Sequence, residues 1–209
     1  MVTVRPHRYD VAVRPHCACV ALSVHPSQKY QSDGGPGVGE ISDLFRPLAE
    51  EDRSDSAERF FAYLAFYAMI GGTDAHAKNY SMLLSGSRAR LAPLYDVASA
   101  ACYPQHDHLR APMKLGRATT FLDVTEKDWE RVGQRLGMPS GWATETVKLL
   151  QDQLPAAFEA AIQALPESAR EVAQQQAERI VEHVERRWVP DQEVDPSRVL
   201  PVATPGSRL

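Results

Sequence analysis

Hydrophobic positions along the first half of the chain predict two helices. Apolar residues recur at helical spacing over residues 38–45 and again over residues 60–70. The second stretch is apolar on most sides, so we expect a buried helix there. Ser54 or Ser56 is the expected N-cap of this helix, and Gly71-Gly72 is expected to end it.

A β-hairpin is predicted directly after this buried helix. Residues 80–84 and 90–94 have strand character and flank Ser85-Gly86-Ser87, which reads as a turn. Pairing across such a turn is expected to place Leu84 opposite Arg90.

Three further stretches of the chain give weaker signals. Residues 9–13 fit a short strand, whereas residues 15–22 follow no clear period. The cluster at residues 33–37 contains three glycines and a proline, so it is predicted to be a loop. Residues 99–122 contain Pro, His and Gly and are also expected to be loop-like.

The second half of the chain predicts three helices, which makes the expected fold class mainly α. Thr125 and Asp128 have the spacing of a capping box at the start of the first helix. The second helix spans about residues 140–164 and is expected to bend at Pro155, and the third starts at Pro166. The residues expected to pack as core against the helix of residues 60–67 are Trp129, Val132, Ile180, Val184 and Trp188.

Composition narrows the functional classes. The chain has 209 residues, a formal net charge of -4 and 44% hydrophobic residues, as expected of a globular protein without broad nucleic-acid binding. No apolar run approaches the roughly 20 residues that span a bilayer, and we see no signal peptide. Three cysteines are too few for a disulfide framework, so the expected location is the reducing cytoplasm.

Three polar residues lie where a packed core would not require them. Asp74 follows the two glycines, Asn79 lies five residues later before the first hairpin strand, and Asp96 follows the second. The hairpin would bring Asn79 and Asp96 together, and their oxygens suit Mg²⁺. The spacing Asp-x-x-x-x-Asn followed by a second Asp is that of kinase catalytic segments, and Lys78 adds a cation for phosphate. Spacing alone leaves open the alternative that Asp74 is an ordinary turn or cap residue.

The sequences of four segments add a resemblance to a known family. Residues 72–81 (GTDAHAKNYS), 91–100 (LAPLYDVASA), 29–37 (KYQSDGGPG) and 113–115 (MKL) resemble, in this order, segments of HipA-like serine/threonine kinases. These kinases are the toxins of toxin–antitoxin pairs. The resemblance covers roughly residues 26–120, and the helical remainder is compatible with it.

The resemblance implies a fold, a chemistry and partners. The fold would be a kinase-like C-terminal lobe, mainly α, with a small β-hairpin carrying the metal site. The activity would be transfer of the γ-phosphate of ATP to a protein Ser or Thr, with Mg²⁺ as cofactor and a DNA-binding antitoxin as partner. The implied site residues are Asp74 as catalytic base, His76, Lys78, Asn79, Tyr95 and Asp96 around ATP, and Asn79 and Asp96 as magnesium ligands.

The same resemblance suggests a domain plan and its alternatives. Residues 26–188 would form the C-terminal kinase lobe, residues 1–25 a divergent remnant of the inter-lobe connection, and residues 189–209 a disordered tail. Nothing before Lys29 resembles the phosphate-covering loop or the ATP-pairing lysine of the family's N-terminal lobe, so we expect a truncated kinase. A catalytically silent partner-binding fragment and one half of a split kinase are the alternatives.

Overall fold

The protein is mainly α-helical, with two small antiparallel sheets. The computed structural model describes residues 14–25, 27–103 and 109–187. Its helices are α1 (Ala18–Ala21), α2 (Val38–Asp43), α3 (Glu50–Ile70), α4 (Glu126–Arg135), α5 (Trp142–Gln163) and α6 (Glu167–Arg187), with short 3₁₀ turns η1 (Gln31–Asp33) and η2 (Ala77–Asn79). Its strands are β1 (Arg14–Cys17), β2 (Ser81–Ser85), β3 (Arg88–Leu91), β4 (Arg110–Leu115) and β5 (Ala118–Thr120).

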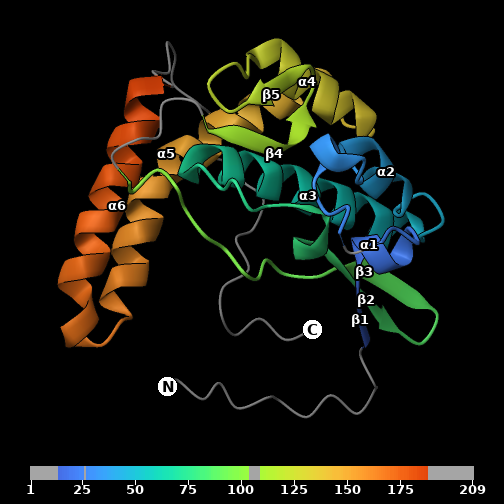
Figure 1. Cartoon of the computed structure of the whole chain (residues 1–209), viewed down its shortest axis with the longest axis horizontal. Helices are drawn as coiled ribbons and strands as arrows, with labels where there is room; N and C mark the ends of the chain where they lie inside the picture. The colour runs from blue at the N-terminus through green and yellow to red at the C-terminus, as the bar shows by residue number, and fades with distance from the viewer. Residues whose placement is uncertain (1–13, 26, 104–108, 188–209) are drawn as a thin grey trace.

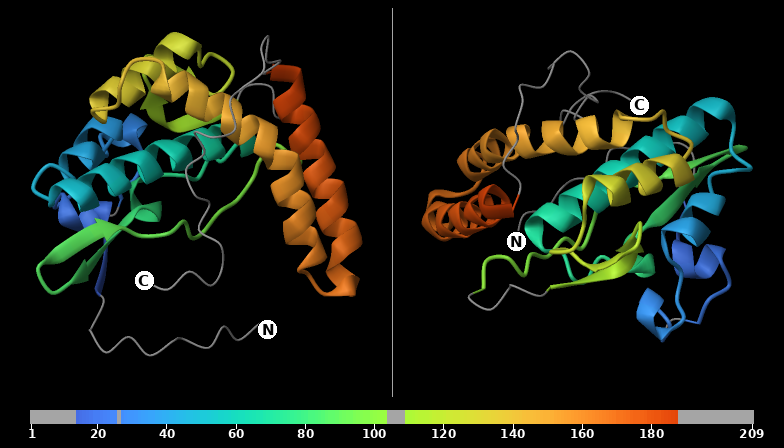
Figure 2. Two further views of the ribbon diagram at one scale, coloured as in Figure 1. Left: turned by 180° about the vertical axis from the view of Figure 1, so that it is seen from behind. Right: turned by 90° about the horizontal axis from the view of Figure 1, so that it is seen from above.

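Helix α3 runs through the middle of the molecule, as its apolar sequence predicts. Figures 1 and 2 show the sheet of β1, β2 and β3 on one side of α3 and the β4–β5 hairpin on the other. Phe60 and Phe61 on α3 are fully buried. The Phe61 ring meets Trp129 of α4 and Trp142 of α5 edge-on, with centroids 5.7 Å and 4.9 Å away. The core is therefore built around α3, against which the flanking elements pack.

The start of α3 differs from the sequence prediction. The helix begins at Glu50, so Ser54 and Ser56 lie inside it and neither is its N-cap. Three acidic residues in the first turn, Glu50, Glu51 and Asp52, complement the positive end of the helix dipole instead. Ser56 is buried, and its Oγ accepts a hydrogen bond at 3.0 Å from the backbone N–H of Leu91. The serine thus joins α3 to the hairpin rather than capping the helix.

The predicted hairpin is present, but its register is shifted by one residue. Leu84 pairs with Ala89 rather than with Arg90, which lies opposite Leu83. The reason is the length of the turn: Ser85 pairs with Arg88, which leaves only two residues in the connection. Gly86 supplies the positive φ of 59° that such a tight turn requires.

Three strands were not predicted from the sequence. The stretch without a clear period contains β1, which pairs with β2 antiparallel, and the expected loop of residues 99–122 contains β4 and β5. These strands are short. β1 pairs with a strand far along the chain, whereas β4 and β5 form a local hairpin with only two residues between Leu115 and Ala118. The strand predicted at residues 9–13 lies outside the described residues.

The helical second half follows the prediction closely. Helix α4 starts after Thr125, α5 contains Pro155 and bends along its length in Figure 2, and α6 starts after Pro166. The predicted core residues Trp129, Val132, Ile180 and Val184 are buried in the main cluster. Trp188 and the tail after it lie outside the described residues. Within the part of the chain that the structure describes, no helix has the length and apolarity needed to cross a bilayer.

Asp128 connects the start of α4 to the β4–β5 turn. Its carboxylate accepts hydrogen bonds from the backbone N–H and the hydroxyl of Thr125, at 3.1 and 2.6 Å. It also accepts from the backbone N–H of Arg117 at 2.9 Å and from the Arg131 guanidinium at 2.8 Å. Burial disfavours the charge, but these donors outweigh it and lower the pKa of Asp128 to about 2.

We predict that Asp128→Asn lowers the free energy of unfolding by about 2 kcal/mol at pH 7. This is the stabilisation that corresponds to the difference between the pKa of Asp128 in the folded protein and the ordinary Asp pKa of about 3.9. The folded-state pKa lies below the unfolded one, so the contribution is present above about pH 4 and is lost as the pH falls towards 2. Urea denaturation at pH 7 and pH 2.5 measures this. Asp152→Asn, at an exposed carboxylate of α5, is the control and should change little. An equal loss at both pH values would contradict the prediction.

Candidate functional site

The end of α3 places the loop that contains Asp74. Gly71 adopts a positive φ of 64°, the left-handed conformation that ends many helices. A Cβ at Gly72 would lie 2.3 Å from the ring of Tyr67, so only glycine lets the chain turn back against the helix. Asp74 therefore emerges two residues later, with its side chain 49% exposed.

Three side chains contact Asp74, and each of them meets the same oxygen, Oδ1. The hydroxyl of Tyr30 donates a hydrogen bond to it at 2.5 Å. The Lys29 ammonium lies 3.5 Å away, and Nε2 of His76 lies 3.4 Å away. Lys29 and Tyr30 come from a loop about 45 residues earlier in the chain.

These contacts set the protonation of Asp74. The hydrogen bond from Tyr30 lowers the pKa of the Asp74 carboxyl, and the positive charge of Lys29 adds to this against the effect of burial. His76 is only 4% exposed, and burial lowers its pKa, as does the charge of Lys29. Asp74 is therefore ionised near neutral pH beside an uncharged imidazole. The structure places His76 beneath Asp74, where its ring meets that of Tyr30 edge-on.

Asn79 and Asp96 are brought together, as the hairpin predicts. Nδ2 of the buried Asn79 donates a hydrogen bond at 3.3 Å to the backbone oxygen of Asp96. This bond uses the amide nitrogen and leaves the amide oxygen available as a ligand. Asp96 is exposed and has a positive φ of 54°, which is uncommon for a residue other than glycine. Such backbone conformations concentrate at functional sites.

Tyr95 and Lys78 connect the two halves of this site. The Tyr95 hydroxyl donates to the backbone oxygen of Lys78 at 2.5 Å and lies 2.7 Å from Oγ of Ser81. The hydroxyl of Tyr95 is thus held within the protein, while the residue is 40% exposed. Among the described residues, no carboxylate forms an ion pair with the Lys78 ammonium.

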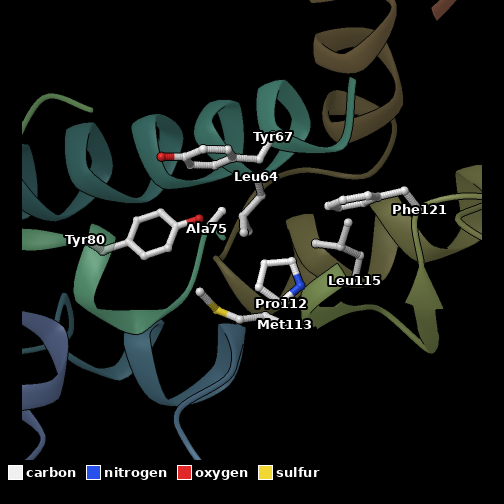
Figure 3. Close-up of a pocket in the computed structure, with 8 residues that line it drawn as sticks. All are labelled: Leu64, Tyr67, Ala75, Tyr80, Pro112, Met113, Leu115 and Phe121. Atoms are coloured by element: carbon white, nitrogen blue, oxygen red, sulfur yellow. The ribbon is translucent and has the colours of Figure 1, made fainter. Parts of the chain in front are cut away.

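Asp74 and Asp96 both act on one buried phenol. Burial raises the pKa of Tyr67 to about 12, and the negative charges of Asp96 and Asp74 contribute to the rise. Figure 3 shows Tyr67 and Tyr80 beside a small cavity that is also lined by Ala75 and by residues of β4. Neither phenol hydroxyl has a hydrogen-bond partner among the described residues. Both carboxylates thus contribute to the electrostatic environment of the same phenol on α3.

The donors present fit a magnesium ion better than a metal bound wholly by protein. Within the described residues, no group of three or more His, Cys, Asp or Glu side chains could hold a metal. Mg²⁺ is usually bound by one or two carboxylates together with substrate phosphates and water. The Asp96 carboxylate and the Asn79 amide oxygen match that pattern.

Sequence reasoning missed the role of Lys29 and Tyr30. Their segment was singled out only by its resemblance to the family, because no spacing argument relates it to Asp74. The structure shows that the backbone oxygen of Lys29 accepts a bond from Ala77 N–H at 3.3 Å. In addition, Oε1 of Gln31 accepts one at 2.7 Å from the N–H of Lys114. Residues 29–37 thus connect the Asp74 loop to β4.

Comparison with known proteins identifies the family of this chain. The family model of the HipA-like C-terminal domain matches residues 5–188. Two curated relatives come from Sinorhizobium fredii. "Putative kinase Y4mE" is 32% identical over 120 residues, which is 57% of this chain and 28% of the relative. "Putative kinase Y4dM" is 24% identical over 150 residues, which is 71% of this chain and 35% of the relative.

A solved structure has the same fold. It is the Shewanella oneidensis MR-1 complex of HipA, HipB and operator DNA, which matches with a TM-score of 0.67 and 19% identity. The match covers 83% of this chain and 43% of the solved chain. This chain therefore spans less than half the length of these relatives. With a family model that matches most of its residues, the chain belongs to the HipA-like C-terminal domain family.

Proposed function

We propose that this chain is the catalytic C-terminal lobe of a HipA-like serine/threonine protein kinase. The observation that carries the proposal is an exposed, ionised Asp74 in the same short loop as Asn79, which is hydrogen-bonded to the backbone of Asp96. This gives a base for the acceptor hydroxyl and oxygen ligands for the magnesium that accompanies ATP, both of which are recurring parts of kinase sites. Two curated relatives with kinase names support the same chemistry.

In the proposed reaction, Asp74 accepts the proton of a Ser or Thr hydroxyl. The hydroxyl oxygen forms a bond to the γ-phosphorus of ATP, the bond from that phosphorus to the bridging oxygen breaks, and ADP leaves. A carboxylate with a lowered pKa is a weak base, but it remains ionised and orients the hydroxyl through a hydrogen bond. That suffices for a transfer in which positioning and charge stabilisation dominate.

The Asp96 carboxylate and the Asn79 amide oxygen would hold Mg²⁺, which would neutralise phosphate charge when bound. The bond from Asn79 Nδ2 to the Asp96 backbone fixes the two residues relative to each other before any ligand arrives. Lys78, with no ion pair among the described residues, is available for a phosphate oxygen. The hydrogen bond from the Tyr95 hydroxyl to the backbone oxygen of Lys78 holds the segments that contain Lys78 and Asp96 together.

We further propose that this lobe acts with a second one. The chain spans 28% and 35% of its two curated relatives and 43% of the solved HipA chain. In the kinase fold, a glycine-rich loop and a strand lysine hold ATP from above, and no segment here resembles them. The solved HipA is in a complex with HipB and DNA, so we propose an antitoxin as a partner of this protein as well.

We predict low phosphoryl transfer by the purified chain alone, because the charged contacts that remain act in open, high-dielectric solvent. Labelling with radioactive ATP and a protein acceptor measures it. Asp74→Asn should remove the remaining transfer, since a positioned base contributes about 10²–10⁴-fold. Asp152→Asn, at an exposed carboxylate of α5 away from the proposed site, is the control. Transfer that persists in Asp74→Asn would contradict the role of Asp74, and robust transfer by the wild-type chain would contradict the need for a second lobe.

Binding of nucleotide is predicted to depend on Mg²⁺ through Asp96. In NMR spectra, ATP with Mg²⁺ should shift the amide signals of Asn79 and Asp96, whereas ATP with a chelator should not. Asp96→Asn should weaken the binding about 10- to 100-fold, the worth of a hydrogen bond or ligand contact to a charged group. Asp152→Asn should bind as the wild type does. Equal shifts with and without Mg²⁺ would rule out this metal site.

A further inference from the structure

The contacts of Asp74 are all on one side of its carboxylate. Tyr30, Lys29 and His76 approach Oδ1 at 2.5, 3.5 and 3.4 Å, and no described residue forms a hydrogen bond or ion pair with Oδ2. A carboxylate has about four lone-pair sites on two equivalent oxygens. The protein therefore makes the two oxygens different, with one held and the other open.

Tyr30 makes the shortest of these contacts, and its backbone is firmly held. Its carbonyl oxygen accepts bonds from the N–H groups of Asp33 and Gly35, at 3.1 and 2.9 Å. A Cβ at Gly35 would lie 2.7 Å from that oxygen and 2.2 Å from the backbone oxygen of Gln28, so the turn depends on glycine. The side chain is held as well, by the edge-on contact with His76 at 5.1 Å.

Lys29 has a supporting part in this arrangement. Its ammonium lies 4.9 Å from the centre of the Tyr30 ring as well as 3.5 Å from Asp74. Its side chain is one-third exposed, so solvent screens its charge. His76 is uncharged, which leaves the Tyr30 hydroxyl as the main determinant of where Oδ1 points.

We propose that Tyr30 is a positioning residue for Asp74. The Tyr30 hydroxyl holds Oδ1 of Asp74, so that Oδ2 faces the incoming Ser or Thr hydroxyl. The statement that Oδ2 binds the Ser or Thr hydroxyl of a substrate rests on the proposed kinase function. The contact between Tyr30 and Oδ1 is independent of that function, because it is present in the protein without substrate. A loop about 45 residues before the catalytic segment thereby becomes part of the catalytic apparatus.

The test uses Tyr30→Phe in the full chain, which keeps the ring against His76 and removes only the hydroxyl. Carbon-13 NMR of the Asp74 carboxyl follows its titration, and the α–β proton couplings of Asp74 report its rotamer. In the wild type we expect one rotamer and a pKa below the ordinary value for Asp. In Tyr30→Phe we expect rotamer averaging and a higher pKa. Tyr103→Phe, at a residue that is 68% exposed, is the control and should match the wild type.

A second variant tests the contact from the other side. The hydrogen bond to Asp74, together with burial, raises the pKa of Tyr30. Asp74→Asn should therefore lower the pKa of Tyr30 towards its ordinary value, measured by the carbon-13 shift of the ring carbon that bears the hydroxyl. This measurement keeps the proposal testable if Tyr30→Phe does not fold.

The outcomes separate this proposal from the kinase function. If Asp74 keeps its rotamer and its pKa in Tyr30→Phe, the positioning role is wrong, whatever the chain phosphorylates. If both change while no substrate is ever labelled, the positioning role stands and the kinase assignment fails. Phosphate found on Tyr30 by mass spectrometry would make the tyrosine an acceptor and would overturn the positioning role.

Discussion

The site depends on how α3 ends. Ile70 is the last residue of a buried helix, and its carbonyl oxygen accepts a hydrogen bond at 2.5 Å from the hydroxyl of Ser99. The backbone oxygen of Gly71 accepts another at 3.1 Å from the N–H of Ala100. A side chain at Gly71 would collide with Leu109, 2.7 Å from the added Cβ. One helix terminus thereby fixes both the loop that starts towards Asp74 and the segment that follows Asp96.

This construction explains how a rigid scaffold can present exposed charged groups. The segments on either side of the site are tied to α3 through buried groups, such as Ser56, whose Oγ binds the backbone of β3. The carboxylates of Asp74 and Asp96 remain accessible, while two of their polar neighbours, His76 and Asn79, are buried. Mobile surface side chains would not hold such groups within the tolerances that phosphoryl transfer needs.

The arrangement also separates two influences on Asp74. Its immediate neighbours in sequence give it His76, which is buried and uncharged. The distant loop of residues 29–37 gives it a hydroxyl donor and a cation, and the same loop is bonded to β4 through Gln31. Through the neighbouring residues Gln31 and Tyr30, β4 and the Asp74 carboxylate are therefore coupled to the same loop.

The sequence by itself determined the helices and the identity of the chemical groups. The period of apolar residues predicts α3, α4, α5 and α6, and Gly71-Gly72, Thr125 and Pro166 mark boundaries through local backbone preferences. Asp74, Asn79 and Asp96 stand out because they are polar residues between apolar elements, where packing of the core does not require them. Such signals are local, since a helix satisfies its hydrogen bonds within a few residues.

Only the tertiary structure decided strands β1, β4 and β5, the hairpin register and the partners of Asp74. Strands β1, β4 and β5 are short, and the register of Leu84 depends on a two-residue turn that the sequence did not delimit. Tyr30 meets Asp74 across 44 positions of sequence, a distance over which no periodicity operates. Pairings of this kind follow from how the whole core packs, because strand partners and side-chain neighbours are set by non-local contacts rather than by the residues beside them.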